Sequence, residues 1–136
     1  MIVSRFTGDL PEVGGDRKIP GGPLYPITEV LELLGAGGSV VRVWTRRCVE
    51  DVQQLALDAD ELAELIVEAV KVGRFSGAQW CQQQPAGPWA ACDAYTLTRR
   101  EWVPAARKEL AVDYYLKFAI GKTGTLLLLV SCHLST

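Results

Sequence analysis

The chain has 136 residues, of which 49% are apolar and 22% are charged, so its length and composition fit one folded domain. Its formal net charge of −2 argues against a protein that binds nucleic acid through its overall charge. The charge is uneven: residues 1–73 carry seven Lys and Arg against twelve Asp and Glu, whereas residues 74–136 carry seven against four. This asymmetry allows a local surface for an anionic ligand.

Neither a membrane span nor a secretory leader is visible in the sequence. The longest uninterrupted aliphatic run, Leu126–Val130, has five residues, whereas a membrane-spanning helix needs about 20. The N-terminal residues Met1–Phe6 lack a basic start followed by an apolar stretch. We therefore expect a cytoplasmic protein with no membrane partner.

Residues 1–24 are rich in Gly and Pro and predict a flexible lead-in, in which Met1–Phe6 forms a short strand at the edge of the domain. Residues 25–136 predict a single domain. A helix is expected to begin at Thr28, as its cap, and to end at Gly35.

Two further helices are expected after a short β-branched strand over Ser39–Thr45. The first begins at Thr45 or Arg46. The second begins at Asp58, where Glu61 completes an acidic capping box, and ends at Gly73. Its apolar residues share one helical face: Leu62, Leu65, Ile66, Ala69 and Val70.

The rest of the chain predicts strands. Arg74–Gln82 and Trp89–Leu97 are β-rich, and Pro104 interrupts Arg99–Glu109, which is expected to be a loop or one short helix. Ala111–Ile120 and Thr125–Leu134 predict a hairpin at the centre of the sheet. The fold class is α+β, with N-terminal helices packed on an antiparallel sheet that ends in this C-terminal hairpin.

The four cysteines lack the close pairs of a zinc site. Cys48, Cys81, Cys92 and Cys132 form no C-x-x-C motif, and we interpret them as small apolar residues of the core. No dinucleotide fingerprint or nucleophile motif is present either, so the sequence predicts neither a metal nor a cofactor.

Three side chains of the expected C-terminal hairpin are candidates for catalysis: His133, Tyr115 and Lys117. His133 is the sole histidine, and imidazole is the side chain that ordinarily exchanges a proton near neutral pH. Ordinary strand alternation explains Tyr115 and Lys117 equally well. A four-residue loop would pair Tyr115 with Val130 and leave it on the opposite face from His133. A bulge, or a loop of three or five residues, would bring the two onto one face, and the sequence does not decide between these registers.

Cations near the expected sheet are candidates for RNA phosphate contacts: Arg99, Arg100 and Lys122. The alternative is a solvated charged surface, because Glu101 and Glu109 partly neutralise the two arginines.

Several short stretches resemble the MqsR family of type II toxins over roughly residues 25–134. The matching stretches are Tyr25-Pro26-Ile27-Thr28-Glu29-Val30-Leu31, Val43-Trp44-Thr45, Phe75, Asp93-Ala94-Tyr95, Tyr115-Leu116-Lys117 and Val130-Ser131-Cys132-His133. The resemblance implies a RelE-like α+β fold and a messenger-RNA endoribonuclease that is paired with a cognate antitoxin protein.

The chain departs from the family at positions that carry function there. The family's functional Lys and Gln are replaced by Gly77 and Cys92, and its final functional Lys is replaced by His133, while its Tyr is kept as Tyr115. Two function classes remain open. One is a metal-independent endoribonuclease that cleaves single-stranded mRNA, and the other is a catalytically silent relative that binds a protein partner through exposed Trp side chains and acidic helices.

Overall fold

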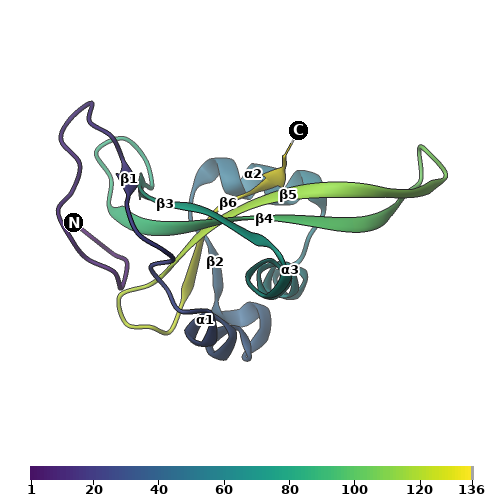
Figure 1. The fold of residues 1–136 in the computed structure, drawn as a ribbon, viewed down its shortest axis with the longest axis horizontal. Helices are drawn as coiled ribbons and strands as arrows, with labels where there is room; N and C mark the ends of the chain where they lie inside the picture. Colours follow the sequence, from purple (N-terminus) through teal and green to yellow (C-terminus); the bar gives the residue numbers. More distant parts are fainter. Residues whose placement is uncertain (136) are drawn as a thin grey trace.

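The computed structural model describes residues 1–135 as an α+β fold in which helices pack against a six-stranded mixed sheet (Figure 1). The helices are α1 (Ile27–Leu34), the 3₁₀ helix η1 (Gly37–Val40), α2 (Arg46–Leu55) and α3 (Ala59–Val72). The strands are β1 (Lys18–Ile19), β2 (Val41–Val43), β3 (Arg74–Gln82), β4 (Trp89–Val103), β5 (Lys108–Ile120) and β6 (Leu127–Leu134).

The strand order is β1-β3-β4-β5-β6-β2, so the C-terminal hairpin lies inside the sheet as the sequence predicts. All neighbours are antiparallel except β2 and β6, which run parallel. The expectation of a purely antiparallel sheet is therefore wrong. The reason is that β2 follows two helical segments and joins the far edge beside the last strand, where no hairpin connection constrains its direction.

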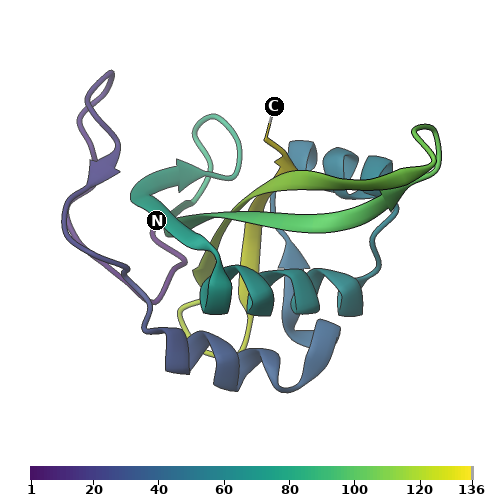
Figure 2. The same cartoon turned by 45° about the vertical axis from the view of Figure 1, so that its right-hand side comes forward.

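Helices α1 and α3 lie together on one side of the long strands, and α2 lies beyond their other side (Figures 1 and 2). Helix α2 packs along β6, and α3 contacts β3 and β4. No helix among the described residues is both long and apolar enough to cross a membrane.

Helix α3 confirms the strongest prediction from the sequence. The Asp58 side chain accepts a hydrogen bond from the Glu61 backbone at 2.8 Å, and the Glu61 side chain accepts one from the Asp58 backbone at 3.0 Å. This capping box fixes the first turn, and Gly73 ends the helix. All five predicted apolar residues are buried, with Leu65 and Ile66 fully inaccessible to solvent.

The caps of the two shorter helices differ from each other. The Thr45 hydroxyl accepts a hydrogen bond from the Cys48 backbone and caps α2, as expected. Helix α1 instead follows Pro26, and no side chain caps it, so the predicted Thr28 cap is wrong. The fixed φ angle of Pro26 directs the chain into this helix. The sequence pattern had instead favoured the Thr28 hydroxyl as the cap.

The C-terminal hairpin is confirmed, but with a different register from the one that a four-residue loop gives. Ile120 pairs with Leu127, and a bulge at Val130 shifts the pairing so that Tyr115 lies directly opposite His133. The pairing of Tyr115 with Val130, one of the registers that the sequence left open, is therefore not the one formed. The bulge is the alternative that places Tyr115 and His133 on one face.

Strands β4 and β5 continue well beyond the helices as a two-stranded arm, seen at the right of Figure 1. The pairing runs without interruption to Val103 opposite Lys108, so the predicted loop or helix over Arg99–Glu109 is wrong. Pro104 lies in the connecting turn, where it interrupts no ladder, and Arg107 closes the turn with a left-handed backbone, φ 52°. Both faces of the arm carry charged residues, Arg99 and Glu101 on one and Arg100 and Glu109 on the other.

The lead-in is tied to the domain at several points. β1 pairs with β3, and Ile2 and Ser4 form single bridges to Trp89 and Gly121. The completely buried Asp93 accepts hydrogen bonds from the backbone of Leu24 at 2.9 Å and of Tyr25 at 3.0 Å. Asp93 therefore joins the lead-in to the sheet where the first helix begins.

The long strands separate two faces of opposite character. The face that packs against α1 and α3, called here the core face, carries apolar and aromatic residues, including Tyr95, Leu97, Leu116, Phe118 and Leu129. The other, called the groove face, carries polar and reactive residues, including Gln79, Cys81, Cys92, Tyr115, Lys117, Ser131 and His133.

Candidate functional site

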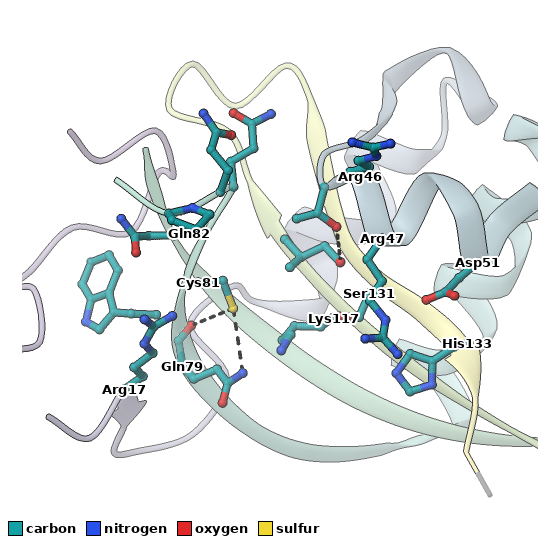
Figure 3. Close-up of a pocket in the computed structure, with 16 residues that line it drawn as sticks. Arg17, Arg46, Arg47, Asp51, Gln79, Cys81, Gln82, Lys117, Ser131 and His133 are labelled. Carbon is teal, nitrogen blue, oxygen red and sulfur yellow. Dashed lines mark hydrogen bonds between the residues drawn. The ribbon is translucent and has the colours of Figure 1, made fainter. Parts of the chain in front are cut away.

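A groove of about 700 Å³ lies on the groove face (Figure 3). Its floor comes from β3, β5 and β6 through Gln79, Cys81, Lys117 and Ser131. The first residues of α2 form one wall, and the loop after β3 and Arg17 of the lead-in form the other. Four segments distant in sequence therefore meet at one hollow.

Positive charge collects in this groove although the whole chain is acidic. Arg17, Arg46, Arg47 and Lys117 line it, against the single carboxylate of Asp51. In the described part of the chain, Arg46 has only a long, exposed pairing with Glu50 at 3.6 Å, and no ion pair involves the other three cations. Cations without partners are available to an anionic ligand.

The first turn of α2 adds to this potential. Arg46 and Arg47 are the first two residues of the helix, where the helix dipole is already positive. Two cations at this end raise the free energy of the helix unless an anion lies nearby. Figure 3 shows the Arg47 side chain extending from α2 toward His133. The arrangement favours an anion held between α2 and β6.

Tyr115 and His133 lie side by side across β5 and β6. Their ring centroids are 5.3 Å apart with planes 28° from parallel, and the Lys117 ammonium lies 5.8 Å from the Tyr115 ring centroid. Lys117 lies opposite Ser131 in the pairing of β5 with β6, two residues along each strand from Tyr115 and His133. The structure therefore brings together the three predicted catalytic residues.

A backbone contact indicates which ring nitrogen of His133 carries the proton. Its Nδ1 lies 3.0 Å from the carbonyl oxygen of Leu134. A carbonyl oxygen only accepts, so in this contact Nδ1 carries the proton and the neutral ring leaves Nε2 free to accept another. The His133 side chain is exposed, so Nε2 can reach a substrate.

A second hollow of about 490 Å³ adjoins Tyr115 and includes Gly77, Gln79 and Ala94. Gly77 follows a bulge in β3, has φ +124°, and leaves open space where a side chain would begin. Gly77 therefore leaves open space beside Tyr115.

Cys81 is the buried thiol that opens into the groove. The Gln79 amide donates to its Sγ at 3.8 Å, as Figure 3 shows. The neighbouring Cys92 and the charge of Lys117 lower the pKa of Cys81, although burial acts in the opposite direction. Burial raises the pKa of Cys92. The sequence identified these cysteines only as core residues and missed this environment.

The three predicted RNA-binding cations lie outside the groove. Arg99 pairs with Glu68 of α3 and with Glu101, and Arg100 pairs with Glu109 on the arm. Lys122 lies in the loop at the opposite end of β5. The cations that the structure gathers instead, Arg17 and the Arg46–Arg47 pair, come from segments that the sequence analysis did not associate with the sheet.

Comparison of the chain with protein-family models, with curated proteins and with solved structures finds no match. The resemblance to the MqsR family therefore stays a prediction from short motifs. Within residues 1–135, no group of three or more His, Cys, Asp and Glu side chains is placed to hold a metal ion.

Proposed function

We propose that the groove binds single-stranded RNA and that the protein is a metal-independent endoribonuclease, the toxin of a type II toxin–antitoxin module. The observation that carries this proposal is the row of Tyr115 and His133 beside Lys117, at the edge of a cation-lined groove in an acidic protein. Such a groove suits the phosphates of a single strand, and the row supplies proton transfer where a phosphate would lie.

The placement of the positions implied by the resemblance supports the same proposal. Gly77, Cys92, Tyr115 and His133 come from four successive strands, β3 to β6, and all lie on the groove face. Nothing in fold stability alone requires them to share a face. Tyr115 and His133 form the row of rings, Gly77 lines the hollow that adjoins Tyr115, and Cys92 is completely buried.

The proposed reaction uses the ribose 2′-hydroxyl as its nucleophile. His133 Nε2 accepts the hydroxyl proton as the 2′-oxygen bonds to phosphorus. Lys117 neutralises the charge that develops on the phosphate oxygens, and the Tyr115 hydroxyl donates a hydrogen bond to one of them. The bond to the 5′-oxygen breaks, that oxygen takes a proton from water, and a 2′,3′-cyclic phosphate remains.

The test is incubation of the purified protein with single-stranded RNA in EDTA. We expect cleavage that leaves cyclic phosphate ends, and we expect His133→Ala to slow it by roughly 10²–10⁴-fold, the usual contribution of a general base. Lys71→Ala, which removes an exposed cation on α3, is the matched control and should cleave at the parent rate. Equal rates for the His133→Ala variant and the parent would contradict the mechanism.

A protein-binding role is the second candidate, with a cognate antitoxin as the expected partner. Trp102 favours it: this side chain is 61% exposed on the projecting arm, where it contributes nothing to the core. The other tryptophans are less available, since Trp80 is buried and Trp44 and Trp89 are half-buried. If the parent protein leaves RNA intact in EDTA, the endoribonuclease proposal fails and the binding role replaces it.

A further inference from the structure

The hollow of about 490 Å³ beside Tyr115 has no part in the proposed proton transfer. Its floor includes Gly77 and Ala94, which lie opposite each other on β3 and β4 and carry almost no side chain. A Cβ atom at Gly77 would meet no other atom within 4 Å. The sheet is therefore open at a place where the side chains of most strand residues would cover it.

The two sides of this hollow suit a flat ring. Tyr115 lines one side. His133 stacks on Tyr115 from β6, with ring centroids 5.3 Å apart, whereas the hollow lies toward β3 and β4. Ile19 and Pro20 of the lead-in line the other side. A planar ligand can therefore lie between an aromatic ring and an apolar wall.

The hollow adjoins the cation-lined groove. Gln79 lines both, and Lys117 of the groove lies opposite Ala94 of the hollow in the pairing of β4 with β5. A strand whose phosphate lies against Lys117 and His133 can turn the base of an adjacent nucleotide toward Tyr115. Bases of single-stranded RNA are commonly recognised in this way, splayed out and stacked on aromatic side chains.

We propose that the hollow binds one nucleobase of a single RNA strand, stacked on Tyr115, next to the phosphate that the groove holds. This inference rests on the proposed function, because it needs an RNA strand in the groove. The bound base adds a third ring to the row of His133 and Tyr115. The hollow thereby positions the strand at the reacting phosphate.

Polar groups at the hollow select among the bases. The Asp16 carboxylate lines it, and its Oδ1 accepts a hydrogen bond from the Lys18 backbone at 3.0 Å. Lys18 also lines the hollow and offers a cation to a flanking phosphate. A carboxylate only accepts hydrogen bonds, so it favours an amino group over a carbonyl. Cytosine carries an amino group where uracil carries a carbonyl, so cytosine should bind more tightly.

Short strands of 2′-O-methyl RNA test the hollow on the parent protein without cleavage. One strand carries bases, and the other is abasic throughout but keeps every phosphate. We expect the abasic strand to bind roughly fivefold to 100-fold more weakly, the usual effect of one stacked base. Equal affinities would overturn the base site and leave phosphate binding in the groove intact. A lack of binding by either strand would overturn both the base site and the RNA groove.

Tyr115→Leu tests whether the base lies in this hollow, because it removes the ring and keeps an apolar side chain. We expect the base-bearing strand to bind this variant only as tightly as the abasic strand does. Trp102→Leu, which removes an exposed aromatic ring on the arm, is the control and should retain the full difference. A full difference in Tyr115→Leu would place base binding elsewhere and overturn the proposal.

Oligocytidine and oligouridine, both 2′-O-methylated, test the role of Asp16. We expect the parent to bind the cytidine strand about threefold to tenfold more tightly. Asp16→Asn keeps an acceptor for the Lys18 backbone but adds a donor, so the preference should fall below about twofold. Asp9→Asn, an exposed residue of the lead-in outside the hollow, should keep the preference. Equal binding of both strands by the parent would overturn selection by Asp16. If base-dependent binding occurs and RNA stays intact, only the cleavage step of the proposed function fails.

Discussion

On the core face, β4 and β5 present Tyr95, Leu97 and Leu116 to α3, whereas Tyr115 and Lys117 of β5 lie on the groove face. The same backbone builds both surfaces, since side chains alternate along each strand. Burial of apolar area determines the first set. No such requirement determines the second set: Lys117 lines the groove together with three arginines, and Tyr115 lines the adjoining hollow.

This difference separates residues that the fold needs from residues that it only positions. Changes on the core face should reduce the free energy of unfolding, and any effect on the site should follow from that loss. Changes on the groove face should alter binding or chemistry at nearly constant stability. Asp93 lies between these categories, because it is polar and yet belongs to the core face.

The largest expected effect is on the core face. Leu65 is completely buried in α3, and Leu65→Ala should lower the free energy of unfolding by about 2–5 kcal/mol through lost burial and a cavity. Denaturant titration measures this change. Glu64→Ala, the exposed neighbour on the same helix, is the control and should change stability by less than about 0.5 kcal/mol. A small loss at Leu65 would mean that α3 does not bury this face.

The next effect comes from the polar contact that fixes the lead-in. Asp93→Ala leaves the backbone N–H groups of Leu24 and Tyr25 without acceptors, which should cost about 1–3 kcal/mol. Limited proteolysis should then cleave the lead-in ahead of α1 faster than in the parent. Asp113→Ala is the matched control, since this carboxylate accepts an exposed hydrogen bond from Thr98. Unchanged proteolysis would contradict the anchoring role.

The same contrast explains which parts of the fold can be predicted from the sequence. Helix α3 is encoded locally by the capping residue Asp58, the apolar period and Gly73, and each of these signals agrees with the others. The parallel pairing of β2 with β6 is not encoded locally, because it joins segments that lie more than 80 residues apart in the sequence. The arm misled the prediction because Pro104, read as a break in the strand pattern, lies in its turn.

The candidate site was predicted only in part, because local patterns in the sequence place some of its residues and contacts between distant segments place the others. Period-two alternation placed Tyr115 and Lys117 on one face, but the position of His133 relative to them depended on one extra residue, the bulge at Val130. Arg17 and Arg47 reach the groove through the packing of the lead-in and of α2. The surroundings of Cys81 had no sequence signal, since Lys117 reaches the same groove from another strand.

A smaller effect is expected on the groove face, in catalysis alone. Tyr115→Phe removes one hydrogen-bond donor from the phosphate but keeps the ring beside His133. We expect cleavage of single-stranded RNA to slow about tenfold, less than in His133→Ala, with an unchanged unfolding midpoint. Tyr95→Phe on the core face is the matched control and should cleave at the parent rate. A larger loss than in His133→Ala would make Tyr115 the main proton-transfer group.

The smallest effect is on the salt dependence of binding and needs no catalysis. A single-stranded RNA with 2′-O-methyl groups lacks the attacking hydroxyl, so its affinity can be measured without cleavage. Each phosphate neutralised by a cation contributes about −0.7 to the slope of log affinity against log salt for a single strand. Lys117→Gln should therefore reduce the slope by about that amount, whereas Lys71→Gln on α3 should leave it unchanged.

Lys122→Gln decides whether the β5–β6 loop also contacts RNA, as the sequence predicted. An equal loss in Lys122→Gln and Lys117→Gln would extend the RNA path beyond the groove, and no loss in Lys117→Gln would remove RNA from the groove altogether.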